Sequence, residues 1–533
     1  MVSVPVCYWR RAAMEGTDPH GRGLALATVV LGAAWIVGVW LWARDAPLPP
    51  DAAAYGVIAR NLARGGGYTE SFIPFHPGPY DSVSHLPDLH GLLTPALLAP
   101  LFAVLGPSAA AVRLPSTLAA AGIAFVVFAL GGRLFGAMPA FLATLVVLAS
   151  PSLFSYATLG TDDTGFTLLA LGTLAALVVG THERRPRLLV GAGLLAGLAI
   201  LEKPTGIFLP ALGVLALLVM RRGTPVPATT IAGVLVPPLV AFGAYLARNQ
   251  LAHGSLDFRF GGLEWIWKDS AFEGMMALYQ RAPTTLETIR RLGPARVLEI
   301  TGEQLAWFAQ ATFALRPIVP VRPVDVLAVV AVPAFLPSLG LVPLPWLARR
   351  VPALALLVLA TFVAAPAAVC TLWHAEPRYF LIFIPLAALV LAGTIGRFRA
   401  GRVAMAALVL VSALGLVRSA RLLAEQPPHP CLAVLEKMNA ASIPGRILTF
   451  DPWAVAWLAD REAVMIPSGG LDAIASVALR YDTRLLLVHP MLGRPDTTAL
   501  LGRLEGGAGP LRVTTLEREG VCRLARLDVV GDQ

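Results

Sequence analysis

Two aspartate sites are the residues of this chain whose types and positions best suit chemistry. Asp51 follows two prolines shortly after the first long apolar stretch, and Asp162 and Asp163 stand side by side between two later ones. A carboxylate close to lipid costs free energy, so it is usually retained for a function. If both sites lie on the same side of a membrane, they can face one another across a cavity.

The composition is that of a membrane protein with many crossings. The chain has 533 residues, of which 56% are hydrophobic and 14% charged, and its mean hydropathy is +0.69. A soluble protein has about a quarter of its residues charged. Uncharged stretches such as 24–43 and 134–161 reach the ~20 residues that a helix needs to cross the hydrocarbon core. The net charge of +9 does not indicate nucleic-acid binding, because the arginines gather in short loops between apolar stretches.

The stretch 91–106 decides the predicted topology. It is apolar but short, and it contains Pro95 and Pro100. If it lies in the interface or re-enters instead of crossing, five basic clusters fall on one side of the membrane, as the positive-inside rule expects. These clusters are Arg133, residues 182–187, Arg221 with Arg222, Arg349 with Arg350, and residues 397–402.

We therefore predict eleven transmembrane helices and a cytoplasmic N-terminus. The first spans 24–43, and Glu202-Lys203-Pro204 forms a tight outer turn between two short helices; one long tilted helix is the alternative. The other ten crossings are expected near 112–132, 137–156, 164–181, 188–201, 205–220, 226–247, 324–348, 352–373, 379–396 and 403–422.

The same reading divides the chain into two domains. Residues 1–424 form the membrane-embedded domain, with a first external loop at 45–110 that contains interfacial helices and a large external loop at 248–322. Residues 425–533 are expected to form a small α/β domain, because charge density rises there and short runs read as buried strands. The odd number of crossings places this domain outside the cell.

Two cysteines lie in the predicted outer domain. Cys431 and Cys522 can form a disulfide in an oxidising compartment. Two unpaired thiols are the alternative, and neither residue has the spacing of a metal-binding motif.

Charged residues of both signs collect at the predicted outer face. They are Asp51, Asp162, Asp163, Lys203, His374, Glu376 and Arg378. A carboxylate can take the proton from an acceptor hydroxyl or amine. Arginine and lysine can offset the charge of a departing phosphate, which is stable as an anion and needs no general acid. The pattern therefore favours transfer of a group from a phosphate-bearing donor.

Several short motifs, in order along residues 24–400, carry a resemblance to a known family. They are Asp51–Leu62 followed by Gly65–Tyr68, Arg113–Ser116, Thr161–Asp163, Leu201–Pro204, and Arg378–Phe380 followed by Pro385. In this order they resemble the membrane-embedded GT-C glycosyltransferases, in particular the protein O-mannosyltransferase and lipid A aminoarabinose transferase group. The resemblance implies a polytopic helical fold and an inverting transfer of sugar from a polyprenyl phosphate to an unidentified lipid, glycan or protein acceptor.

The resemblance also implies roles for individual residues. Asp51 corresponds to the catalytic base, and Asp162 or Asp163 to the acid that holds an acceptor or a metal ion. Arg378 and Lys203 are expected to bind the donor phosphate. Tyr55 and His90 are also assigned to donor binding. One departure is that Ala52 stands where many relatives have a second acid, so a divalent metal ion, if it takes part, is expected at Asp162 and Asp163.

Simpler interpretations remain open for these residues. The aspartates can cap helices, Lys203 and Arg378 can anchor helix ends in the interface, and His76, His85 and His90 can be ordinary loop residues. A transporter or lipid flippase is the alternative function, although its polar groups would be expected near the midplane in two related halves. An inert membrane scaffold is a third. The resemblance implies the bacterial cytoplasmic membrane as the location.

Overall fold

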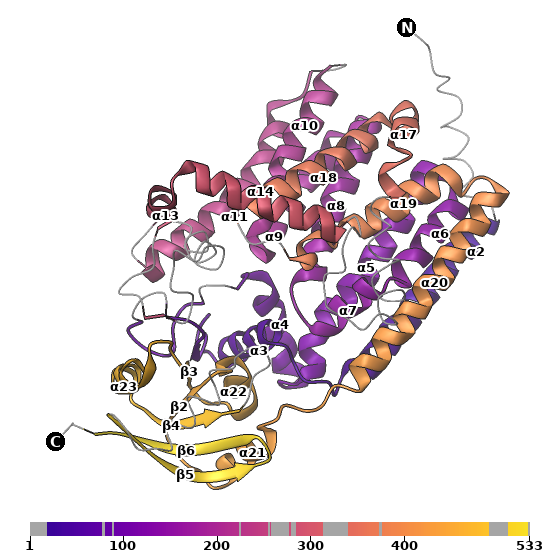
Figure 1. Cartoon of the computed structure of the whole chain (residues 1–533). Helices are drawn as coiled ribbons and strands as arrows, with labels where there is room; N and C mark the ends of the chain where they lie inside the picture. Colours follow the sequence, from indigo (N-terminus) through magenta and orange to yellow (C-terminus); the bar gives the residue numbers. More distant parts are fainter. Residues whose placement is uncertain are drawn as a thin grey trace. The chain divides into compact units, whose positions relative to one another are not determined.

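The computed structural model divides into two compact units. It describes residues 19–76, 80–87, 90–222, 225–253, 256, 277–278, 284–312, 339–372, 376–489 and 510–530. The first unit, here the helical unit, comprises Met1–Arg44, Arg113–Ala247 and Thr301–Glu425. The second, the sheet unit, comprises Asp45–Val112, Arg248–Ile300 and Gln426–Gln533. Figure 1 shows the elements of both.

Long apolar helices dominate the helical unit. An α-helix satisfies its own backbone hydrogen bonds, which lipid cannot do for it. The helices that lie wholly or mostly in this unit are α2 (Pro19–Ala43), α5 (Ala109–Phe135), α6 (Ala137–Leu148), α7 (Pro151–Leu159), α8 (Asp163–His182), α9 (Pro186–Glu202), η2 (Pro204–Phe208), α10 (Leu209–Arg221), α11 (Ala228–His253), α14 (Pro294–Thr312), α17 (Leu344–Arg350), α18 (Pro352–Leu372), η3 (Pro377–Phe380), α19 (Phe383–Ile395) and α20 (Arg399–Ala424).

The prediction of a multi-pass helical membrane protein is confirmed. Among the described residues, seven helices are long and apolar enough to cross a bilayer, and the bent pair α6 and α7, which meet at 56°, would make eight. Of the remaining three predicted crossings, 188–201 corresponds to the 17 residues of α9 and 379–396 contains the 13 residues of α19. The third, 324–348, lies mostly outside the described residues. The total of eleven stays a prediction.

The segment around residues 91–106 forms a short helix of the sheet unit. Helix α4 (Leu93–Leu105) has 13 residues and is about 20 Å long at 1.5 Å per residue, which is less than the ~30 Å of a hydrocarbon core. Its Leu98 and Phe102 pack against Ala52 and Tyr55 of α3 (Pro50–Ala63) in one buried cluster. As predicted, this segment is too short to cross a membrane alone.

The sheet unit is built on six strands in the order β1-β3-β2-β4-β6-β5. The strands are β1 (Phe72–Ile73), β2 (Arg446–Thr449), β3 (Ala463–Met465), β4 (Thr483–Val488), β5 (Leu511–Glu519) and β6 (Cys522–Val529). The first four are parallel, whereas β6 runs antiparallel to both β4 and β5.

The predicted domain boundary near residue 425 differs from this division. Strand β1 belongs to the predicted first external loop, yet Phe72 and Ile73 pair with Ala463 and Val464 of β3. Residues 45–112 and 248–300 therefore form one unit with the C-terminal segment. The physical reason is that the β3 edge would otherwise present unpaired backbone groups, and β1 covers it.

Helices cover both faces of the parallel strands. Successive side chains of a strand point to opposite faces, so Ile447 and Leu448 enter two different cores. Helix α23 (Gly470–Tyr481) packs on the Leu448 side. The Ile447 side is covered by α3, α21 (Leu432–Ala440) and α22 (Pro452–Ala459). Burial on both faces explains why these strands read as continuous apolar runs. The sheet unit also includes α13 (Thr285–Leu292).

A disulfide joins Cys431 to Cys522, 91 residues apart in sequence. The bond links the residue before α21 to the first residue of β6, inside the core on the Ile447 side. It resolves the two alternatives for these cysteines in favour of pairing.

Candidate active site

Lys203 forms ion pairs with both predicted site aspartates of the helical unit. Its Nζ lies 2.9 Å from Oδ1 of Asp162 and 2.5 Å from Oδ1 of Asp163. All three residues are buried, with exposed fractions of 8%, 5% and 1% in that order. Thr161 Oγ1 donates a hydrogen bond to Oδ2 of Asp163 over 2.7 Å. Two carboxylates and one ammonium thus share a site with a net charge of −1.

The chain brings these groups together through an antiparallel helix pair. Asp162 and Asp163 begin α8, whereas Lys203 directly follows the last residue of α9. The two helices are joined by a short turn after His182, so the start of α8 and the end of α9 lie at the same end of the pair. Pro204 disfavours helix at the residue before it, and Lys203 is extended, with φ −147° and ψ 118°. The predicted break at Lys203 is confirmed, and a single long helix is excluded.

The capping interpretation does not account for the aspartates of the helical unit. Asp162 occupies the N-cap position of α8 but makes no side-chain cap hydrogen bond. The two carboxylates instead face the Lys203 ammonium. The positive end of the α8 dipole also favours negative charge at this position.

A divalent metal ion does not fit between Asp162 and Asp163 beside Lys203. A bound Mg²⁺ or Ca²⁺ would need to approach the carboxylate oxygens to roughly 2.0–2.6 Å. The ammonium already lies within 2.9 Å of one oxygen of each residue. It supplies the positive charge that a metal would bring, and the two cations would repel one another.

Arg378 lies at the same aromatic ring as Lys203. The Lys203 Nζ is 4.9 Å from the ring centroid of Tyr379, and the Arg378 guanidinium carbon is 5.5 Å from it. Arg378 belongs to the short helix η3 and pairs with Glu376. Its side chain is 24% exposed, against 9% for Lys203. The two residues predicted to bind the donor phosphate therefore lie at the ring of one tyrosine.

Asp51 lies in the sheet unit, in the first turn of α3. Pro49 is the N-cap, so Asp51 is not the capping residue, and it is half-buried. Tyr55, one turn later, contacts His90 edge-on with 5.0 Å between the ring centroids. Tyr55 and His90 are 3% and 5% exposed. These three candidate residues thus lie on α3 and just before α4.

Arg248 is a site candidate that the sequence interpretation missed. It is 8% exposed, and its Nη1 donates to the backbone carbonyl of His90 over 3.3 Å. Its Nη2 donates to the side chain of Asn249. The signal in the sequence is an arginine within the last two turns of the otherwise apolar helix α11. It adds a buried guanidinium at the backbone of His90.

The other first-loop histidines have structural partners. His76 donates from Nε2 to the carbonyl of Met465 over 2.8 Å, and burial lowers the pKa of His76 to about 4, so the ring is neutral at pH 7. His85 Nε2 lies 3.0 Å from the buried carboxylate of Glu70. His374 lies outside the described residues.

These features define a multi-pass membrane protein with carboxylates and cations at the ends of its helices. Residues 89–242 match the family model described as dolichyl-phosphate-mannose-protein mannosyltransferase. No curated protein sequence matches the chain.

Solved structures share the fold over nearly the whole chain. The crystal structure of ArnT from Cupriavidus metallidurans bound to undecaprenyl phosphate matches 95% of this chain and 99% of that chain, with 16% identity and a TM-score of 0.60. The apo oligosaccharyltransferase of Archaeoglobus fulgidus matches 87% of this chain and 69% of that chain, with 13% identity and a TM-score of 0.53. These matches confirm the predicted polytopic helical fold, and the family match over residues 89–242 agrees with the predicted resemblance to the protein mannosyltransferase and ArnT-like group.

Proposed function

We propose that the protein transfers one sugar from a polyprenyl-phosphate donor to an acceptor hydroxyl or amine at the extracytoplasmic face. The acceptor oxygen or nitrogen attacks the anomeric carbon while the bond from that carbon to the phosphate oxygen breaks. The acceptor proton goes to a carboxylate, and the polyprenyl phosphate leaves as an anion. A single displacement of this kind inverts the anomeric centre.

The arrangement of Lys203, Tyr379 and Arg378 is the observation that carries this proposal. Two cations share one aromatic ring, and the more exposed Arg378 can reach a substrate while Lys203 stays paired with Asp162 and Asp163. Arginine presents a planar fork that matches a phosphate. The similar ArnT structure is bound to undecaprenyl phosphate, which supports a lipid phosphate as the donor carrier here. A transporter is not favoured by the family match.

Asp51 is proposed as the base that takes the acceptor proton. It lies in the first turn of α3 and is half-buried, so its carboxylate is less solvated than one in open water. Arg248 is proposed to assist Tyr55 and His90 in binding the donor, because its buried guanidinium donates to the His90 carbonyl and the His90 ring packs against Tyr55. Lys203, and not a metal ion, supplies the positive charge between Asp162 and Asp163.

We propose that the sheet unit faces an oxidising compartment outside a bacterial cytoplasmic membrane, with the N-terminus inside. The Cys431–Cys522 disulfide supports this location, since such bonds persist mainly in oxidising compartments.

Replacement of Asp51 by asparagine tests the proposal. Loss of a general base typically lowers a rate by about 10²–10⁴-fold, and Asn keeps the shape of the side chain. Mass spectrometry of lipids and glycans should show a product in cells that produce the wild type and almost none with Asp51→Asn. Asp45→Asn is the matched control, because Asp45 is exposed and lies outside α3. An Asp51→Asn protein present in normal amount with an unchanged product profile would refute Asp51 as the base.

A further inference from the structure

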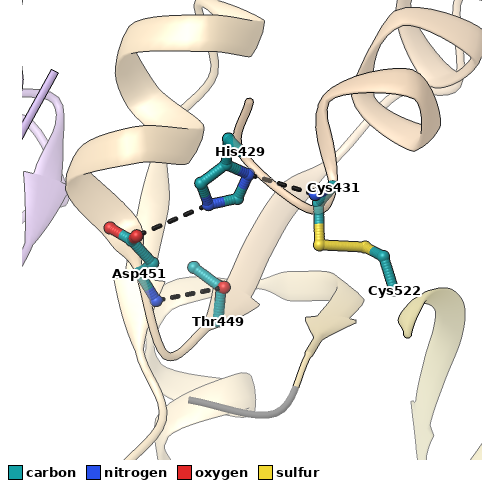
Figure 2. The surroundings of a disulfide bond; sticks show 5 residues. All are labelled: His429, Cys431, Thr449, Asp451 and Cys522. Atoms are coloured by element: carbon teal, nitrogen blue, oxygen red, sulfur yellow. Dashed lines mark hydrogen bonds and ion pairs between the residues drawn. A yellow bond between two sulfur atoms is a disulfide. The ribbon is translucent and has the colours of Figure 1, made fainter. Parts of the chain in front are cut away.

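A second group of polar residues lies in the sheet unit and plays no part in the transfer proposed above. It consists of His429, Asp451 and His489, whose potential ligand atoms all lie within 4.8 Å of one another. Figure 2 shows His429 pointing toward Asp451, with 3.5 Å between Nε2 and Oδ2. The rings of His429 and His489 meet edge-on, with 5.2 Å between their centroids.

The topology of the sheet places this group where parallel sheets commonly bind ligands. Asp451 follows β2 by two residues and His489 follows β4 directly, and these two strands are neighbours. From β2 the chain continues to β3 on one side, whereas after β4 it continues to β5 and β6 on the other side. Ligands of open α/β sheets bind at the carboxyl ends of strands where the connections diverge in this way.

The surrounding structure holds each of the three side chains in place. Asp451 caps α22, because its Oδ1 accepts a hydrogen bond from the Ala454 amide over 3.1 Å, while Oδ2 faces His429. His429 is two residues before Cys431, which the disulfide fixes to β6. His489 is 5% exposed. Fixed ligand positions of this kind favour metal binding, since little order is lost when the ion enters.

We propose that His429, Asp451 and His489 form a binding site for one divalent transition-metal ion of the Zn²⁺ type. Two imidazoles and one carboxylate suit zinc and its neighbours, whereas Mg²⁺ and Ca²⁺ prefer oxygen ligands alone. A bound ion would connect the segment before α21 to the ends of β2 and β4. It would leave at least one coordination position for water or for a further ligand.

Figure 2 shows His429 between Asp451 and the backbone of Cys431. The backbone amide of Cys431 donates to Nδ1 of His429 over 3.2 Å, and Nε2 faces Asp451. A metal-bound imidazole instead donates a proton from its other nitrogen. Metal binding through Nε2 therefore requires Nδ1 of His429 to give up the Cys431 amide. The competing interpretation is a permanent His429–Asp451 hydrogen bond.

The test is the metal content of the full-length protein, purified in detergent without a histidine tag. The protein is stripped with a chelator, equilibrated with micromolar Zn²⁺ and washed, and bound zinc is then counted by elemental mass spectrometry. The wild type should retain one zinc per chain. Asp451→Asn keeps an oxygen to cap α22, and both it and His489→Asn should weaken binding at least 100-fold. His182→Ala, which removes an exposed histidine at the end of α8, should bind like the wild type.

A second measurement separates a lost site from a misfolded protein. Zn²⁺ should raise the thermal unfolding temperature of the wild type but not that of Asp451→Asn, and the two proteins should unfold at similar temperatures in chelator. Absence of zinc in the wild type would refute the site and leave a permanent His429–Asp451 contact as its explanation. Equal zinc in Asp451→Asn and the wild type, or loss of zinc only in Asp162→Asn, would also overturn the site. None of these outcomes depends on sugar transfer.

Discussion

The two units of the protein differ in how deeply they bury their ion pairs. In the helical unit, Lys203 lies between two carboxylates, and the side chains of all three are less than 10% exposed. In the sheet unit, Asp460 is 48% exposed and pairs with Arg60 of α3 and with Arg64, which follows α3 directly. Charges interact more strongly, and cost more when unpaired, where water is excluded.

The difference in exposure between the two clusters indicates which of them has a functional role. The Arg64–Asp460 pair lies in water, where an ion pair adds little stability. The Lys203 cluster is held where each charge depends on its partners, at the end of a membrane helix pair. Because the Lys203 cluster costs so much to bury, a function best explains it. Four measurements test the contrast between this buried cluster and the exposed Arg64–Asp460 pair.

Removal of Lys203 should strongly lower the stability of the helical unit. Lys203→Met leaves Asp162 and Asp163 buried side by side without their cation, and breaking a buried pair in this way costs about 3–5 kcal/mol. Chemical unfolding in detergent should show the loss, and Lys203→Met combined with Asp162→Asn should recover part of it. A Lys203→Met protein as stable as the wild type would show that the cluster is solvated.

Loss of the disulfide should destabilise the sheet unit and leave the helical unit little changed. A loop of this length corresponds to about 4–5 kcal/mol in the chain-entropy model. Hydrogen exchange in the double variant Cys431→Ser/Cys522→Ser should accelerate in β2 and β4. Cys370→Ala, which removes a buried thiol of α18, should not change exchange in these strands. Equal acceleration in α8 and β4 would show that the two units do not unfold separately.

Acid should lower the stability of the sheet unit, because His76 binds a proton more readily in the unfolded chain. The folded-state pKa of His76 is lowered to about 4 from an ordinary value of 6.5, so the unfolded chain binds a proton first. The stabilisation is fully present above pH 6.5 and is lost as the pH falls toward 4; the loss at pH 5 is about 2 kcal/mol. Exchange of β3 amides at pH 7 and pH 5 measures it. His76→Gln should reduce the pH difference, and an unchanged difference would assign it to other groups.

Loss of Arg64 should have the smallest effect on stability. Its pair with Asp460 is exposed on both sides, 57% and 48%, and such pairs are worth about 0–1 kcal/mol. Arg64→Ala should shift the unfolding midpoint of the sheet unit only slightly, and high salt should remove even that shift. Arg60→Ala is the informative comparison, because Arg60 is buried and also donates to the carbonyls of Ala456 and Trp457. A loss of several kcal/mol for Arg64→Ala would contradict the contrast between exposed and buried pairs.

The sequence was sufficient to predict the helices and one half of the candidate site. Apolar length is a local property, so the spans around α2, α8 and α20 could be read directly. The turn at Lys203 followed from Pro204, and the antiparallel helix pair then placed Lys203 at the same end as Asp162 and Asp163. The presence of β2 and β4 was also readable from their apolar runs.

Other features could not be predicted because they join distant segments. Strand β1 has only two residues, and its partner β3 lies about 390 positions later. Arg248 reaches the His90 carbonyl across 158 positions. The cluster of His429, Asp451 and His489 depends on the order of strands in the sheet. No local periodicity marks any of these contacts.

The sequence by itself thus determined that this is a multi-pass membrane protein, which residues are charged near lipid, and where the helices break. Only the tertiary structure decided that the first loop and the C-terminal segment share one sheet, that Lys203 pairs with both Asp162 and Asp163, and that two cysteines are joined. The physical reason is that hydrophobic burial is not directional. A sequence pattern shows which face of an element is buried, and the packed structure selects the neighbour.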